Sequence, residues 1–198
     1  MIESRFAYFL NAVLYNIWFW DIRSQDIINR MVYTVMSLIP KYLLWGKCRD
    51  KVFELQRQGK MEFEKIRYDK ESGFHIVIAN NLFGAFYSCY SGFLSFVIAG
   101  ILIRKFVAVI NPAIMIVISI IPIGAFYIPA YKAVFTDDRY LKYFKQFEKE
   151  DKRWHKKWAL ITWAFCVGGI IIDFFGIITM MAIVSGGYSN INVPFLPH

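Results

Sequence analysis

Three long stretches of the chain contain almost no charged residue. Asp, Glu, Lys and Arg are absent from 72–103 and from 106–131, and Asp173 is the only one of them after Lys157. Because a helix needs about 20 apolar residues to cross the hydrocarbon core of a bilayer, each stretch is long enough to cross it. The pattern predicts three transmembrane helices, over Leu82–Ile103, Pro112–Tyr131 and Trp158–Val184.

The second of these helices has a clear start signal. Asn111 can accept a backbone hydrogen bond as the N-cap residue, and Pro112 at the first helical position loses only an N–H that has no partner there. The connector 104–110 then joins the first two spans into a transmembrane hairpin within 74–131. Pro122 removes one backbone hydrogen bond near the middle of the second span, so we expect a kink there, with a gating hinge as the alternative.

The N-terminal region 1–46 carries two shorter apolar runs. Phe6–Trp20 and Met31–Trp45 would each cover only about 24 Å as a helix, because a helix rises about 1.5 Å per residue. We predict a pair of short apolar helices there, which are interfacial, re-entrant or a further hairpin. The predicted fold class is therefore an all-α integral membrane protein with three spans, or five.

A charged segment, 132–157, precedes the third span. Thr136 followed by two aspartates indicates a helix start, and no Gly or Pro interrupts Ala130–Val167, so one amphipathic helix is predicted to continue into the span. Aromatic residues recur on one face of it and need a cover, which is the segment 47–73, a second subunit or the lipid surface. We interpret this aromatic stripe as facing a partner. It consists of Tyr140, Phe144, Phe147 and Trp154.

The other charged segment, 47–73, is ambiguous. Its first half has a helical pattern, whereas alternating apolar residues over 60–80 also fit strands around a turn at 70–73. Because an isolated two-stranded hairpin is marginal in water, a helix is the preferred prediction.

Basic residues predict the orientation. Segments 47–73 and 132–157 hold 17 of the 23 Lys and Arg residues, and the tail 185–198 holds none. The positive-inside rule therefore places both segments inside and the C-terminus outside. The same segments hold 11 of the 15 acids, which argues against a nucleic-acid surface and leaves membrane lipid as the partner of the basic residues.

Composition supports a membrane protein and narrows the chemistry. Hydrophobic residues make up 57% of the chain and charged residues 19%, which excludes disorder, and three cysteines exclude a disulfide scaffold. Nucleotide-binding, metalloprotease, serine-hydrolase and CxxC motifs are absent from the sequence, so we predict no catalytic residue, no cofactor and no metal site. The scattered histidines, among them His75, fit predicted segment boundaries.

Small residues form a regular face on the first and third predicted spans. They recur at alternating three- and four-residue steps, which allows membrane helices to approach closely. We expect the two faces to pack against each other, with an oligomeric or partner-facing seam as the alternative. The seam consists of Gly84, Ser88, Ser91, Gly92 and Ser95 in the first span and of Thr162, Cys166, Gly169 and Gly176 in the third.

Asp173 is the polar residue that stands out within a span. It lies near the centre of Trp158–Val184, where an ionised carboxylate costs about 2.5–3.5 kcal/mol or more. It should therefore face protein or water, and hydroxyls of Ser88, Ser91 and Ser95 are the expected donors. The open alternatives are a hydrogen-bonded residue that fixes helix register and a residue that handles protons or ions.

These features favour a non-enzymatic subunit or interaction component of a membrane complex, which binds other subunits or itself. The alternative function is an oligomeric channel, pore-former or ion-coupled component that uses Asp173. A bacterial cytoplasmic membrane is the preferred location, with an organellar inner membrane as the alternative.

Overall fold

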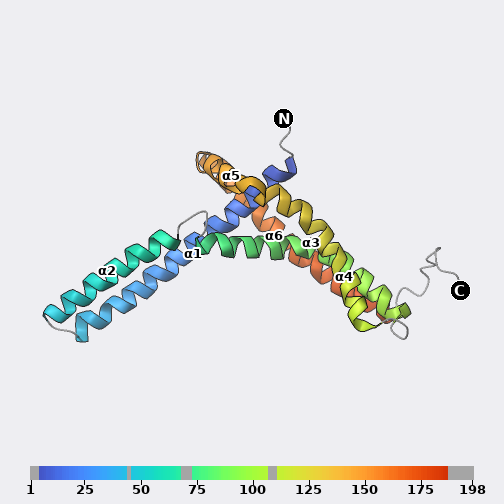
Figure 1. Ribbon diagram of the computed structural model, residues 1–198, viewed down its shortest axis with the longest axis horizontal. Helices are drawn as coiled ribbons and strands as arrows, with labels where there is room; N and C mark the ends of the chain where they lie inside the picture. Colours follow the sequence, from blue (N-terminus) through green and yellow to red (C-terminus); the bar gives the residue numbers. More distant parts are fainter. Residues whose placement is uncertain (1–4, 44–45, 68–72, 107–110, 187–198) are drawn as a thin grey trace. The chain divides into compact units, whose positions relative to one another are not determined.

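The computed structural model describes residues 5–43, 46–67, 73–106 and 111–186, and every regular element in them is a helix (Figure 1). Within these ranges there is no strand, so the predicted all-α class is confirmed. The helical alternative for 60–80 is also confirmed wherever that segment is described. Of the predicted tail 185–198, the structure describes only residues 185 and 186, and 187–198 lie outside the described residues.

Three helices are long and apolar enough to cross a membrane, and they lie where the three spans are predicted, which indicates a membrane location. The first is α3 (Phe74–Phe106) and the third is α6 (Lys152–Val184). The second is α4 (Pro112–Phe135), which continues through a 3-10 turn into α5. Each helix extends beyond its predicted apolar core, α3 at both ends, α4 at its C-terminal end and α6 at its N-terminal end. The start of α4 at Pro112 and the end of α6 at Val184 are as predicted.

The start of α4 matches the sequence signal. Asn111 is the N-cap, and its side-chain oxygen accepts a hydrogen bond of 2.8 Å from the backbone N–H of Ala113. Pro112 occupies the first turn, where its missing N–H costs nothing. Two prolines lie inside the helix. One is Pro122, where a kink is predicted from the sequence, and the other is Pro129, for which no kink is predicted.

The predicted pair of short N-terminal helices is wrong. Residues 5–43 form a single 39-residue helix, α1 (Arg5–Leu43), which continues through the polar stretch 21–30. That stretch contains no Gly or Pro to end a helix, and its charged side chains do not oppose helix formation. The buried amides of Asn11 and Asn16 donate to carbonyl oxygens of α1 itself, so the first half can be buried despite these polar residues.

The predicted continuous helix from Thr136 into the third span is also wrong. After η1 (Thr136–Asp138), α5 runs only over Arg139–Phe147, and α6 begins at Lys152. Asp151 ends the break, because its carboxylate accepts a hydrogen bond of 2.7 Å from the Trp154 N–H and so caps α6. At the start of α5, Asp137 and Asp138 have positive φ angles, and the side chain of the N-cap residue Asp138 makes no capping hydrogen bond. Aspartate tolerates this left-handed conformation better than most residues.

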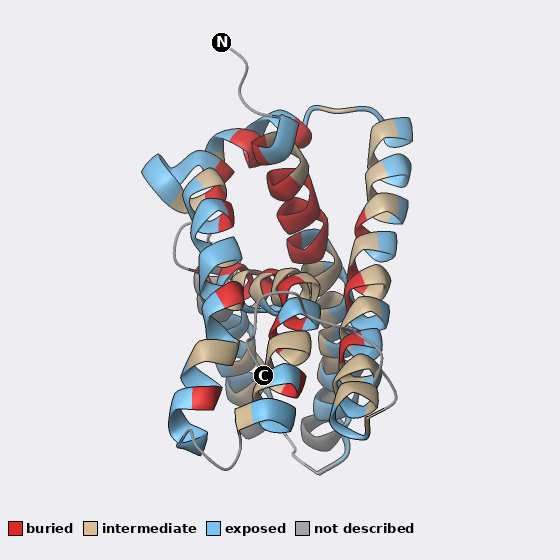
Figure 2. Ribbon diagram, turned by 90° about the vertical axis from the view of Figure 1, so that its right-hand side faces the viewer, coloured by how far each residue is buried: buried red, intermediate tan, exposed pale blue. Residues whose placement is uncertain are grey.

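The chain divides into two compact units. Unit 1 contains Met1–Phe83 and Asp137–Thr162, and unit 2 contains Gly84–Thr136 and Trp163–His198. In unit 1, α1 packs against α5 and against α2 (Lys47–Arg67). The longest run of buried residues, red in Figure 2, lies in the first half of α1 and includes residues 10–18. In unit 2, α4 and the larger parts of α3 and α6 lie around a cavity.

Candidate functional site

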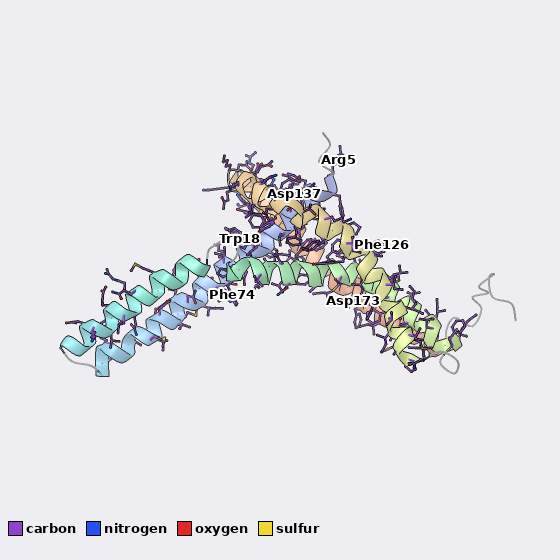
Figure 3. The ribbon with its side chains drawn as sticks, in the orientation of Figure 1. Arg5, Trp18, Phe74, Phe126, Asp137 and Asp173 are labelled. Carbon is purple, nitrogen blue, oxygen red and sulfur yellow. The ribbon has the colours of Figure 1, made fainter. Side chains whose placement is uncertain are left out.

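The aromatic stripe is part of the core of unit 1. Phe144 and Phe147 are fully buried, and Tyr140 is buried as well. The ring of Tyr15 on α1 lies 5.1 Å from that of Phe144 and 5.6 Å from that of Phe147 between centroids. Beside them lies Trp18 of α1, whose ring is 5.1 Å from Phe144 (Figure 3).

Trp154 at the start of α6 completes this aromatic cluster. Its ring stacks on Phe147 at 4.7 Å, and its indole N–H donates to the Tyr8 hydroxyl at 2.9 Å. The break between α5 and α6 makes this stacking possible, because it lets Phe147 and Trp154 meet across a turn. The stripe is therefore covered by α1 of the same chain, which was not among its three expected covers. It does not present an exposed surface to a partner.

Unit 1 also contains a polar pair, His75 and Asp21, that the sequence pattern did not predict. His75 is 0% exposed, and its Nδ1 lies 2.5 Å from a carboxylate oxygen of Asp21. His75 is the second residue of α3 and so lies at a helix boundary, as the sequence indicates, but it is buried there. The signal in the sequence was Asp21, an acid that directly follows the apolar run of α1.

The small-residue faces of α3 and α6 meet within unit 2, as expected. A Cβ added at Gly169 would lie 3.0 Å from the carbonyl oxygen of Phe86, and one at Gly176 would lie 2.9 Å from Phe93 Cα. Gly100, which the prediction omitted, extends the same contact, because a Cβ there would lie 3.2 Å from Met180 Cα. Close packing of this kind requires the absence of a side chain.

Other seam residues have different surroundings. Gly84 faces α4, because a Cβ there would lie 3.4 Å from the Tyr127 hydroxyl. Cys166 is a buried free thiol, and Thr162 is buried in unit 1. Tyr90 adds a polar contact to the seam, since its hydroxyl donates to the Phe165 carbonyl at 2.7 Å.

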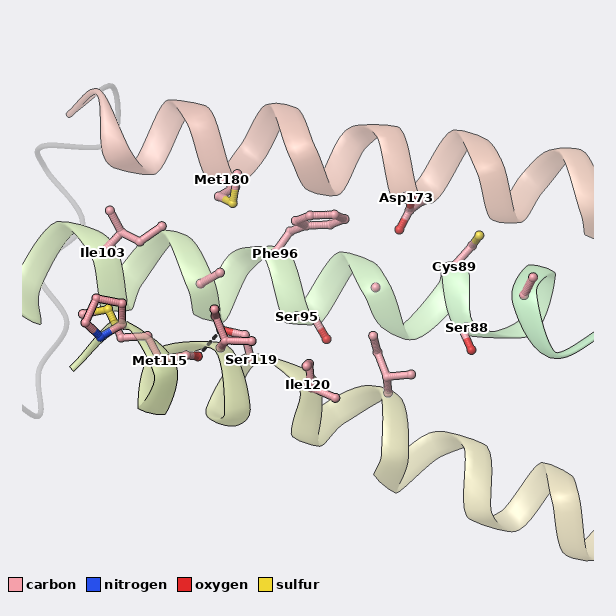
Figure 4. Close-up of a pocket in the computed structure, with 16 residues that line it drawn as sticks. Ser88, Cys89, Ser95, Phe96, Ile103, Met115, Ser119, Ile120, Asp173 and Met180 are labelled. Atoms are coloured by element: carbon pink, nitrogen blue, oxygen red, sulfur yellow. Dashed lines mark hydrogen bonds between the residues drawn. The ribbon is translucent and has the colours of Figure 1, made fainter. Parts of the chain in front are cut away.

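Unit 2 holds a cavity of about 620 Å³ between α3, α4 and α6. In Figure 4, α3 is drawn between α4 and α6. The lining includes Met115, Ser119 and Ile120 on α4 and Asp173 and Met180 on α6. Most lining side chains are apolar. Its polar lining consists of Ser88, Cys89, Ser95, Ser119 and Asp173.

Asp173 points from α6 towards α3 at this cavity (Figure 4). Its carboxylate lies directly over Gly92, where an added Cβ would collide with Oδ1. The prediction that Asp173 faces another helix, on the side of α6 that carries Gly169 and Gly176, agrees with this placement. Gly92 thus has a second role besides close helix packing, because it leaves room for the carboxylate.

The expected hydroxyl donors do not reach Asp173. The Ser91 hydroxyl donates to the Ser88 carbonyl at 3.0 Å, and the Ser95 hydroxyl donates to the Ser91 carbonyl at 3.4 Å. Ser119 likewise donates to the Met115 carbonyl within α4. These serines satisfy their own helices, and among the described residues Asp173 has no hydrogen-bonding or ion-pair partner.

Among the described residues, no three His, Cys, Asp or Glu side chains come together as metal ligands would. The free thiols Cys89 and Cys166 belong to α3 and α6. Comparison with protein-family models, with curated proteins and with solved structures finds no match to this chain.

Proposed function

We propose that this chain is a non-enzymatic integral membrane protein that works as a subunit of a membrane complex and assembles through α1. The observation that supports this proposal is the second half of α1, where large apolar side chains are exposed over residues 27–42. Met31 is 65% exposed, Val35 61% and Tyr42 72%. An exposed apolar surface of this length is typical of a contact surface.

The exposed side chains recur at the spacing of a helix–helix seam. Alternating steps of three and four residues connect Ile28, Met31, Val35, Leu38 and Tyr42. This is the a and d pattern of a coiled coil, with β-branched Ile28 and Val35 at a and unbranched or γ-branched Met31 and Leu38 at d. Such a combination favours pairing of two like helices, so the proposed partner is a second copy of the chain.

The helix α2 leaves this seam open. It lies beside α1 (Figure 1), and Lys60 of α2 lies 4.9 Å from the ring centroid of Tyr33. Tyr33 is two residues from both Met31 and Val35, and at about 100° per residue it points to the opposite side of α1. The charged helix α2 thus covers one side of α1, and the seam lies on the other.

The orientation and location belong to the same proposal. With 17 of 23 basic residues in 47–73 and 132–157, we place these segments on the inner side and the C-terminus outside. The membrane is a bacterial cytoplasmic membrane, with an organellar inner membrane as the alternative. Anionic lipid is the partner of the basic residues near the start of α6.

The channel alternative receives less support. An ion path needs a polar lining, whereas the cavity at Asp173 is lined mainly by apolar side chains, and the hydroxyls of Ser95 and Ser119 bond within their own helices. Asp173 is therefore better explained by a ligand other than a permeating ion.

Disulfide cross-linking tests the assembly. With the three native cysteines replaced by alanine, Val35→Cys should give a dimer of this chain on oxidation in native membranes. Arg30→Cys is the matched control, because Arg30 is exposed on another side of α1 and should give little dimer. A Val35→Cys protein that stays monomeric, or that cross-links no better than Arg30→Cys, would refute pairing through α1.

A further inference from the structure

The cavity in unit 2 combines an apolar lining with one carboxylate. Its volume of about 620 Å³ lies within the usual range for small-molecule sites, about 300–1,000 Å³. Such sites have apolar walls and a few polar groups that fix the orientation of the ligand. Here the carboxylate of Asp173 is the charged group in the lining.

The carboxylate of Asp173 has no cation or hydrogen-bond donor beside it among the described residues. An ionised aspartate near the centre of a spanning helix costs about 2.5–3.5 kcal/mol or more unless it is paired or hydrated. Among the described residues no Lys, Arg or His lies in the cavity lining, and the hydroxyls of Ser91, Ser95 and Ser119 donate to backbone carbonyls. A cation in the cavity would supply the missing partner.

The lining also restricts which cation fits. A bare metal ion requires several oxygen or nitrogen ligands, whereas the described residues gather no such group and the cavity offers one carboxylate. Apolar side chains such as Ile103, Ile116 and Ile120 would contact an apolar body instead. The cation must therefore carry its own hydrophobic groups.

We propose that this cavity binds an apolar organic cation, such as a hydrophobic amine or quaternary ammonium, with its charge on Asp173. Phe96 provides a second favourable group, because an aromatic ring face attracts such cations. Its ring packs on Gly176, where an added Cβ would lie 3.0 Å from Phe96 Cδ2, three residues along α6 from Asp173. Figure 4 shows Phe96 and Asp173 next to each other between α3 and α6.

Gly92 is the positioning residue of this site. Any side chain there would displace the carboxylate, since Asp173 Oδ1 lies closer to the position of an added Cβ than two such atoms can approach. The sequence pattern explains Gly92 by helix packing alone, but the structure shows a contact with the charged group. The proposal is independent of pairing through α1, because it uses other helices.

Binding of tetraphenylphosphonium to the detergent-purified full chain tests the proposal by isothermal titration calorimetry. The wild-type chain should bind this cation at one site per chain and should bind the neutral triphenylphosphine oxide at least about tenfold more weakly, as loss of a charged interaction implies. Asp173→Asn should weaken cation binding by a similar factor and leave the weak neutral binding unchanged. Asp173→Glu should retain cation binding.

Two glycine variants complete the test. Gly92→Ala should weaken cation binding because it displaces the carboxylate. Gly124→Ala in α4 should bind like the wild type, because an added Cβ there would contact nothing within 4 Å beyond its chain neighbours and the backbone of its own helix turn. A wild-type chain that does not bind the cation would overturn the proposal. So would equal binding by Asp173→Asn with an unchanged unfolding temperature, or equal affinity for the cation and its neutral analogue.

Discussion

At the scale of single residues, glycines decide how closely α3 and α6 approach each other. At Gly176 an added Cβ would lie 2.9 Å from Phe93 Cα, a backbone atom that cannot rotate away. The regular spacing of small residues predicts this contact, because only small side chains allow such an approach. Which neighbour each glycine meets was not predictable from spacing, as Gly84 against Tyr127 and Gly92 against Asp173 show.

Gly176→Ala should therefore destabilise unit 2. The added methyl group forces α3 and α6 apart, and overpacking of this kind costs about 1–3 kcal/mol. The unfolding temperature in detergent should fall relative to the wild type. Gly124→Ala is the matched control, since the space around Gly124 is open and alanine favours helix, so its unfolding temperature should stay equal or rise. Equal behaviour of both variants would contradict the close contact.

A second residue-scale prediction concerns Tyr15. Burial raises the pKa of its phenol above the ordinary value of 10.0, and the Glu148 carboxylate raises it further. Because the folded state holds this proton more tightly than the unfolded state, its contribution to stability is complete below about pH 10 and is lost as the pH rises through the raised value. The Tyr15→Phe chain has no phenol at this position, so its free energy of unfolding should not fall at alkaline pH for this reason.

The measurement compares unfolding temperatures at about pH 8 and about pH 11. The difference between the two pH values should be larger for the wild type than for Tyr15→Phe. An identical alkaline loss in both proteins would show that Tyr15 does not ionise with unfolding of unit 1.

At the scale of helices and their ends, the sequence predicted the start of α4, where the side chain of Asn111 caps a backbone N–H group. Asn111 and Pro112 predicted the start of α4 correctly. The end of α5 has no such signal, because the residues at 148–151 all occur in helices, and packing decides. The stacking of Phe147 on Trp154, the burial of Phe147 and the hydrogen bond from Trp154 to Tyr8 of α1 favour a turn over a straight helix.

Phe147→Ala should consequently loosen α5 from α1. Phe147 is fully buried among aromatic rings, and removal of a buried phenylalanine side chain costs about 3–5 kcal/mol. Thermal unfolding followed by tryptophan fluorescence, to which Trp154 contributes, should show an earlier transition. Lys145→Ala, which changes an exposed residue of the same helix, is the control and should unfold like the wild type. A Phe147→Ala transition at the wild-type temperature would contradict this role.

At the scale of the whole molecule, charge gaps predicted the number of apolar spans, because lipid tolerates few charges over about 20 residues. The charge gaps did not predict that α1 is one continuous helix, because two 15-residue apolar runs separated by a polar stretch fit either two helices or one. The structure shows one helix, because buried Asn11 and Asn16 bond to their own backbone and residues 21–30 contain no helix breaker. The cover of the aromatic stripe depends on this long-range arrangement, which local patterns do not encode.

The most direct test of the account is the transmembrane arrangement itself, measured by cysteine labelling in intact cells. In a chain whose native cysteines are replaced by alanine, Ser189→Cys should react with a membrane-impermeant maleimide, and Gln58→Cys should react only after permeabilisation. The proposed three crossings by α3, α4 and α6 would put these two positions on opposite sides of the membrane, and the proposed orientation has the basic segments inside. Labelling of both positions in intact cells, or of Gln58→Cys alone, would contradict the three-span arrangement or its orientation.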